Sequence, residues 1–109
     1  VCTAEACHFR DLAAEFAAAG ATRAGISADP VDRLASWQTR QSFDFPLLSD
    51  PDGVAASAYG VRRGLLGKLS PVKRTTFVID TDRRILEVIA SELRASVHAD
   101  RALDALRAR

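Results

Sequence analysis

The apolar positions at the start of the chain recur with the period of an α-helix. They form one stripe of alanine, leucine and phenylalanine, and Gly20 follows the stripe where a helix can end in the left-handed conformation. The members of the stripe are Ala6, Phe9, Leu12, Ala13, Phe16 and Ala17. This spacing predicts one helix that begins near Cys2 and ends at Gly20.

Two further helical stripes follow. Asp29-Pro30 is typical of a helix start, with Asp29 as the cap and Pro30 in the first turn, and this helix is expected to end near Ser42. Within it, we expect Trp37 to pack rather than to bind a ligand. The third stripe, from His98 to Arg109, predicts a last helix with Ala102, Leu103, Ala105 and Leu106 facing the core.

Runs of strand length separate these helices. Residues 21–28 predict a short strand in which Gly25 allows close approach by a neighbour, and residues 43–48 predict a second strand. A turn at 49–53 and a short helix at 54–59 come next, before a loop at 61–73. We expect the leucines of this loop, Leu65, Leu66 and Leu69, to pack over the core or a functional site rather than to form a partner-docking surface. Thr75 to Ile79 is β-branched and aromatic, and it predicts a hairpin with residues 85–89. The order of elements is that of a three-layer α/β domain.

Composition narrows the class of protein. A chain of 109 residues is long enough for one core, so we expect a single domain over residues 1–109. A net charge of +1 argues against broad attraction to nucleic acid, and the basic residues at 62, 63, 68, 73 and 74 are interpreted as a solvated loop. No apolar run approaches the roughly 18 residues of a membrane span, and no signal peptide is visible, so the prediction is a cytoplasmic protein.

Both cysteines of the chain, Cys2 and Cys7, lie at its start. If a helix begins near Cys2, the unpaired N–H groups of its first turn lower the pKa of that thiol, while the charge of Glu5 partly opposes the thiolate. In a helix the two Cα atoms would be about 8 to 9 Å apart. A disulfide needs about 7 Å or less, so a Cys2–Cys7 bond requires the first turns to unwind. The spacing alone leaves open small core residues, a redox pair or a weakly supported zinc or copper site.

The run Cys-Thr-Ala-Glu-Ala-Cys-His-Phe-Arg-Asp at 2–11 resembles the active-site segment of peroxiredoxins of the bacterioferritin comigratory protein type, also called the Q type. Further matches follow in the same order at residues 25–29, 45–53, 58–61 and 74–80. The resemblance implies the thioredoxin-like α/β/α fold of peroxiredoxins. Because the chain has no methionine and starts one residue before Cys2, we expect the first strands of that fold, and a loop with Pro and Thr, to be absent from it.

The resemblance also implies a chemistry. Cys2 is the peroxidatic thiol that attacks hydrogen peroxide or an alkyl hydroperoxide, Arg74 of Arg-Thr-Thr-Phe is the active-site arginine, and Cys7 resolves the sulfenic acid as an intramolecular disulfide. Thioredoxin or a similar thiol reductant recycles both thiols, and no metal, flavin or haem is needed. His8 is expected at the surface. The prediction is a monomer or weak homodimer, and the alternative is a non-catalytic redox sensor or an inactive thioredoxin-fold fragment.

Overall fold

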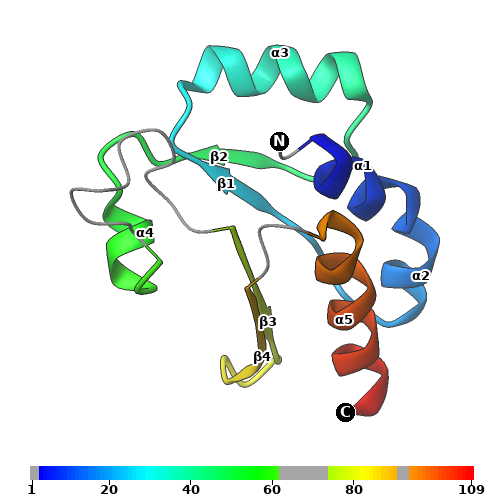
Figure 1. Cartoon of the computed structure of the whole chain (residues 1–109). Helices are drawn as coiled ribbons and strands as arrows, with labels where there is room; N and C mark the ends of the chain where they lie inside the picture. The colour runs from blue at the N-terminus through cyan, green and yellow to red at the C-terminus, as the bar shows by residue number, and fades with distance from the viewer. Residues whose placement is uncertain (1–2, 62–73, 91–93) are drawn as a thin grey trace. The chain divides into compact units, whose positions relative to one another are not determined.

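The structure, a computed structural model, describes residues 3–61, 74–90 and 94–109 (Figure 1). Cys2 therefore lies outside the described residues, and so do the leucines and the basic residues of the 61–73 loop. The chain divides into two compact units, one of residues 1–22 with 74–109 and one of residues 23–73. Each unit is described by itself below.

Two consecutive helices, α1 (Thr3–Asp11) and α2 (Ala13–Ala18), open the first unit. The expectation of one uninterrupted helix is wrong, because Leu12 between them has φ −96° and ψ 22°, outside helical values. Backbone bonds from Leu12 N to His8 O and from Phe16 N to Leu12 O still connect the two helices. No proline or glycine marks this position, so the pattern of apolar residues carries no sign of the break. Gly20, with φ 74°, ends α2 as predicted.

The hairpin of the first unit joins β3 (Thr75–Ile79) to β4 (Ile85–Ala90). The strands are antiparallel, with Thr76 opposite Ile89 and Val78 opposite Glu87, and the register shifts between Val78 and Ile79. The hairpin was predicted from its β-branched residues, and β4 continues one residue beyond the expected end. Side chains of Thr76, Val78 and Ile89 share one face, since they occupy alternate or directly opposite positions.

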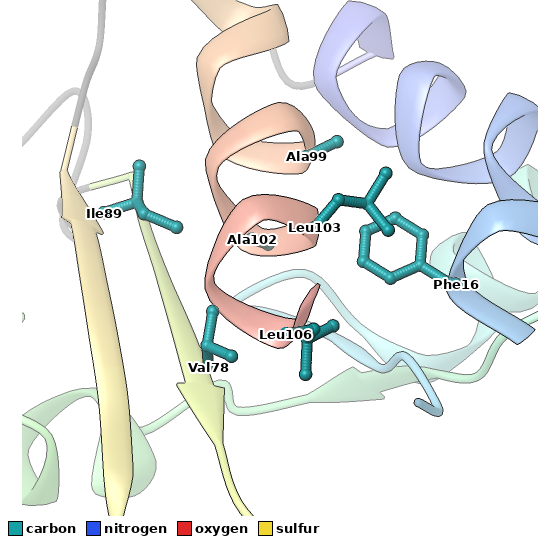
Figure 2. Close-up of a cluster of buried hydrophobic side chains, with 7 residues drawn as sticks. All are labelled: Phe16, Val78, Ile89, Ala99, Ala102, Leu103 and Leu106. Carbon is teal, nitrogen blue, oxygen red and sulfur yellow. The ribbon is translucent and has the colours of Figure 1, made fainter. Parts of the chain in front are cut away.

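The core of the first unit forms around α5 (Ala95–Ala108). In Figure 2, α5 lies between the hairpin, which contributes Val78 and Ile89, and α2, which contributes Phe16. Of the positions predicted to face the core, Ala102, Leu103 and Leu106 are buried and Ala105 packs at its edge. The helix begins three residues before the expected start, so that His98 is already inside it and is buried.

The second unit is built from β1 (Gly25–Ser27), α3 (Val31–Gln41), β2 (Leu47–Ser49) and α4 (Val54–Ala58). The two strands are parallel and joined through α3, with Gly25 opposite Leu47. A Cβ on Gly25 would lie 2.8 Å from Cδ2 of Leu47, so the predicted close approach at this glycine is confirmed. Asp29 does not cap α3: the cap position is Pro30, without a side-chain bond, and the Asp29 carboxylate accepts a hydrogen bond from Ser27 Oγ instead.

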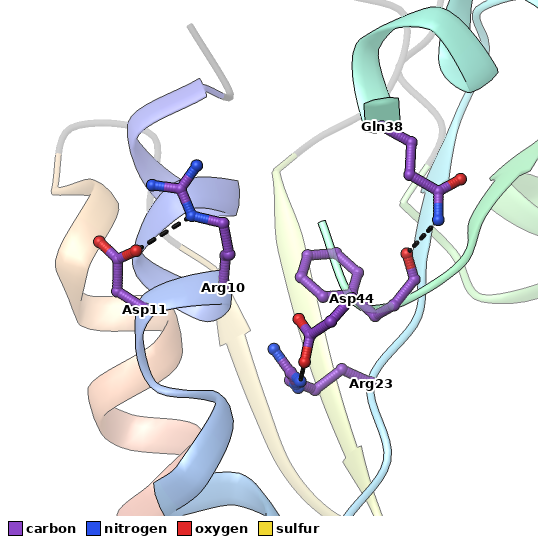
Figure 3. Close-up of polar contacts among 6 residues, drawn as sticks. Arg10, Asp11, Arg23, Gln38 and Asp44 are labelled. Carbon is purple, nitrogen blue, oxygen red and sulfur yellow. Dashed lines mark hydrogen bonds and ion pairs between the residues drawn. The ribbon is translucent and has the colours of Figure 1, made fainter. Parts of the chain in front are cut away.

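The strand expected at residues 43–48 begins only at Leu47. Phe43 and Phe45, which precede it, are buried with stacked rings 5.3 Å apart, and Trp37 packs edge-on against Phe43, as expected of a packing residue. Polar bonds fix the same segment: Arg23 pairs with Asp44, and the Gln38 amide donates to the Phe45 carbonyl oxygen (Figure 3). Side-chain packing and these bonds hold the segment, so it needs no strand partner.

The longest helices of the described residues are amphipathic rather than apolar. Among them, no helix has the length and continuous hydrophobicity that a membrane span requires.

Candidate active site

The two cysteines lie close together in the sequence, around the start of α1: Cys2 directly precedes the helix, and Cys7 is within it. Helix α1 begins at Thr3, the residue that follows Cys2. Cys2 itself lies outside the described residues, whereas Cys7 is half-buried in the second turn of α1. The predicted separation of the two thiols by an intact helix is therefore not tested, because the position of Cys2 is not described.

Glu5 stands in the first turn of α1, where a carboxylate also favours the helix dipole. Its side chain is only 14% exposed, which is unusual for a glutamate. The two carboxylate oxygens face different partners: Oε2 lies 3.4 Å from Nε of Arg74, and Oε1 lies 3.5 Å from Nδ1 of His98. Glu5 thus joins the start of α1 to the residue before β3 and to α5.

Arg74, the predicted active-site arginine, directly precedes β3, and its side chain is 21% exposed. Its contact with Glu5 engages Nε of the planar guanidinium. Its terminal nitrogens carry the remaining N–H donors of the fork. Arg74 thus contacts Glu5 through Nε, and its guanidinium carries donors of the kind that bind an oxygen or sulfur anion.

His98 closes the cluster from α5. Its side chain is completely buried, and Nδ1 lies 2.8 Å from Oγ1 of Thr76 on β3, the strand that follows Arg74. Four side chains from α1, β3 with its preceding residue, and α5 thus converge: Glu5, Arg74, Thr76 and His98. We call these four residues the Glu5 cluster.

Burial raises the pKa of Glu5 above its ordinary value, and the neighbouring His98 and Arg74 act in the opposite direction. Oε2 of Glu5 is inaccessible to solvent and, within the described part of the chain, makes no hydrogen bond of good geometry. Its 3.4 Å approach to Arg74 is therefore an ion pair rather than an aligned hydrogen bond. Burial therefore disfavours the ionised form of Glu5, and the contacts with His98 and Arg74 favour it.

A second polar contact joins α1 to α5 at the surface. Nε2 of His8 lies 2.8 Å from Oδ1 of Asp100, and the His8 side chain is half-buried rather than fully at the surface as expected. His8 is the residue after Cys7, so this pair holds the turn of α1 that carries the second thiol. Phe9, the next residue, packs against the core and stacks on Phe16 with ring centroids 5.5 Å apart.

Thr76 and His98, two members of the Glu5 cluster, were not predicted as site residues, and Glu5 was considered only for the effect of its charge on the Cys2 thiolate. A signal for His98 exists: it lies four residues before Ala102 and eight before Leu106, on the apolar stripe of the last helix. A histidine within such a stripe is buried and therefore needs polar partners. The identity of these partners depends on the packing of α5 against α1 and β3. A local sequence pattern does not predict this long-range packing.

Metal-binding potential is low in the part of the chain that the structure covers. Over residues 3–61, 74–90 and 94–109, no three histidine, cysteine, aspartate or glutamate side chains gather in a way that could hold a metal ion.

Comparisons with known proteins agree with one another. The sequence profile of the AhpC/TSA family matches residues 1–88. Peroxiredoxin Bcp of Escherichia coli K12 is 33% identical over 109 residues, covering 97% of this chain and 69% of that protein.

Two solved structures are similar in fold as well as in sequence. Peroxidoxin BcpB from Mycobacterium tuberculosis is 63% identical with a TM-score of 0.91, and the match covers 98% of this chain and 70% of that one. The bacterioferritin comigratory protein of Xanthomonas campestris, solved in a study of its alkyl peroxide reduction activity, is 30% identical with a TM-score of 0.85, over 95% of this chain and 68% of that one. The predicted thioredoxin-like fold class is thereby confirmed, and the chain belongs to the peroxiredoxin family of thiol peroxidases, in the group of the bacterioferritin comigratory protein or Q type.

Proposed function

We propose that this chain reduces hydrogen peroxide and alkyl hydroperoxides with Cys2 as the peroxidatic thiol. The Cys2 thiolate attacks the terminal peroxide oxygen, the O–O bond breaks, and the products are a sulfenic acid on Cys2 and an alkoxide that takes a proton to leave as water or an alcohol. The sulfur is oxidised by two electrons and the peroxide is reduced by two. Peroxide reduction by the Xanthomonas campestris protein supports alkyl hydroperoxides as substrates.

The observation that carries this proposal is the ion pair of Arg74 with Glu5. It brings the one arginine singled out by the family resemblance to the first turn of α1, the turn that directly follows Cys2 in the sequence. A cation beside a thiolate stabilises the attacking sulfur and the oxyanion that leaves. A surface arginine without such a fixed partner would stabilise these anions far less, because its side chain would have to be ordered during the reaction.

Cys7 resolves the sulfenic acid in this proposal. Its thiol displaces hydroxide from Cys2, the hydroxide takes the thiol proton to leave as water, and an intramolecular disulfide forms. The ideal-helix separation of about 8 to 9 Å requires α1 to unwind before this step. Thioredoxin or a similar dithiol then returns both cysteines to thiols and is itself oxidised to a disulfide; the cytoplasm, which supplies such reductants, is the compartment we propose.

Intact mass after peroxide treatment tests both steps. One equivalent of hydrogen peroxide is expected to remove two hydrogens from the reduced chain and to protect both thiols from alkylation. In Cys7→Ser the same treatment is expected to add one oxygen, which marks a sulfenic acid that nothing resolves. Turnover with thioredoxin at the wild-type rate in Cys7→Ser would contradict the role of Cys7, and slow oxidation of the wild-type chain would contradict the activity of Cys2.

A further inference from the structure

His98 is a buried titratable group that the proposed peroxide reaction does not use. Its side chain is 0% exposed, whereas histidine usually keeps one end of its ring in contact with water. The unperturbed pKa of histidine is close to physiological pH, so a buried histidine changes the charge of its surroundings when it takes up or loses a proton. A buried histidine on the core-facing side of α5 therefore needs polar partners, and these partners indicate what it does.

Its contacts point toward the reaction site. Nδ1 faces Thr76 Oγ1 at 2.8 Å and Glu5 Oε1 at 3.5 Å, and the other oxygen of Glu5 faces Arg74. Thr76 anchors the imidazole to β3, since its hydroxyl can accept from a protonated Nδ1 or donate to an unprotonated one. The imidazole in turn fixes one oxygen of Glu5, which leaves the other oxygen opposite the guanidinium.

Several charged groups lie on the described elements that pack against α5. Glu5 and Arg74 belong to the cluster, while the other charged side chains of α1 and β4 are paired elsewhere: His8 with Asp100, Arg10 with Asp11, and Glu87 with Arg101. Cys7 on α1 and Glu15 on α2 are further titratable groups on the described elements that pack against α5. Glu5 is the acid that lies within ion-pair distance of His98, with Oε1 3.5 Å from Nδ1.

We propose that His98 is a positioning residue for Arg74: from α5 it holds the Glu5 carboxylate, and the carboxylate holds the guanidinium at the reaction site. The inference rests on the function proposed above for Arg74. If His98 is lost, Glu5 keeps Arg74 as its only cationic partner in the Glu5 cluster. The buried carboxylate then takes up a proton more readily or turns away, and the guanidinium loses the group that orients it.

Two variants test this inference at different points. His98→Asn places an amide nitrogen close to the position of Nδ1 but carries no charge at any pH, and Thr76→Val removes only the hydroxyl that anchors the ring. Each is expected to lower the rate constant for the first reaction of Cys2 with hydrogen peroxide by about 10- to 100-fold at neutral pH, because a displaced positioning group is costly to a preorganised site. Thr39→Val is the matched control for the threonine, since its hydroxyl bonds to the Ala35 carbonyl within α3, and it is expected to leave the rate constant unchanged.

A double variant separates positioning from simple packing. If His98 acts through Glu5, His98→Asn will slow the reaction in the wild-type chain but will add almost nothing in a Glu5→Gln background. An equal slowing in both backgrounds would show a merely structural effect and would overturn the inference. So would a rate constant and a pH profile of His98→Asn that match those of the wild type.

A readout independent of peroxide chemistry distinguishes this failure from failure of the proposed function. The carboxyl carbon of Glu5 is followed by NMR as a function of pH, and its pKa is expected to be higher in His98→Asn than in the wild type. Should the wild-type chain not react with peroxide, the proposed function fails, and the titration still decides whether His98 supports the carboxylate. An unchanged pKa of Glu5 would overturn the inference. If His98→Asn does not fold, Thr76→Val and its control carry both measurements.

Discussion

At the scale of single residues, burial and neighbouring charge act on Glu5 in opposite directions. Its carboxylate is 14% exposed and one oxygen lacks a well-aligned hydrogen bond among the described residues, so water has been replaced by two cationic neighbours. Burial outweighs them, because the net effect is a raised pKa. Burial of the Glu5 carboxylate therefore costs free energy of unfolding, and we expect this cost to be retained because the carboxylate serves function.

The variant Glu5→Gln tests whether Glu5 lowers stability while it supports the reaction. A group whose pKa is raised on folding contributes stability that is fully present below the unfolded value of 4.5 and is lost as the pH rises through the folded pKa. Glutamine imitates the protonated carboxyl at every pH, so the variant is expected to gain in unfolding free energy relative to the wild type as the pH rises above 4.5. Urea unfolding between pH 4 and pH 8 measures this difference. At neutral pH the same variant is expected to react more slowly with peroxide, since Arg74 loses its counter-charge.

Loss of stability in Glu5→Gln that grows as the pH rises would contradict this account. It would mean that the ion pairs with Arg74 and His98 outweigh the cost of burial, and that the carboxylate is a structural support rather than a strained functional group.

At the scale of elements, the proposed reaction places two opposing requirements on α1. The helix is proposed to stay folded while the Cys2 thiol reacts with peroxide, and to unwind so that Cys7 can reach Cys2. The contacts that hold it are the Glu5 cluster at its first turn, the His8–Asp100 pair in its second half and the packing of Phe9 on the core. The break at Leu12 limits the unit that must unwind to α1, because α2 begins a new helix beyond it.

Asp100→Ala tests how far the His8–Asp100 pair slows this unwinding. The pair is partly solvated, and such pairs contribute roughly 0.2 to 1 kcal/mol. Its removal is expected to speed conversion of the sulfenic acid to the disulfide by about 1.4- to 5-fold, with the first reaction of Cys2 little changed. Rapid-quench alkylation follows the two steps separately, and amide exchange in α1 reports its opening. Asp104→Ala, an exposed acid one turn further along α5, is the control; an equal acceleration there would rule out a specific effect of the pair.

At the scale of the whole molecule, the chain has two cores in two compact units, each about half of the sequence. One centres on α5 with Ile89, and the other contains Leu34 with Phe43 and Phe45. Units of this size are marginal when alone, because they bury a small fraction of their surface. We therefore keep the prediction that residues 1–109 fold as one domain.

Ile89→Ala and Leu34→Ala test that prediction. Both side chains are buried, and each truncation is expected to cost about 2 to 5 kcal/mol of unfolding free energy. In a single cooperative domain, each variant lowers the midpoint of one shared transition, whichever unit carries the change. Circular dichroism and the fluorescence of Trp37, which lies in the second unit, should then report the same midpoint. A transition that Trp37 fluorescence does not follow in Ile89→Ala would show that the units unfold separately.

The sequence by itself determined the identity and order of nearly all elements. Helical stripes, a β-branched hairpin and glycine stops act through neighbours a few residues apart, and so α3, α5, β3 and β4 could be predicted from local periodicity. The motif around the two cysteines, with Arg74 in its own motif, pointed to the peroxiredoxin family, and the comparisons confirmed that family. The break at Leu12 and the late start of β2 escaped prediction, because packing rather than local preference decides them.

Only the tertiary structure decided which side chains meet at the candidate site. Glu5, Arg74 and His98 are far apart in the sequence. Considered alone, Glu5 is a charge in a first helical turn, Arg74 is a solvated charge, and His98 is one residue of a helix. They meet because α5 packs on α1 and on the hairpin, and this contact encloses polar groups that must then satisfy one another. Burial and long-range contact set the charge state of Glu5, and no pattern along the chain contains either of them.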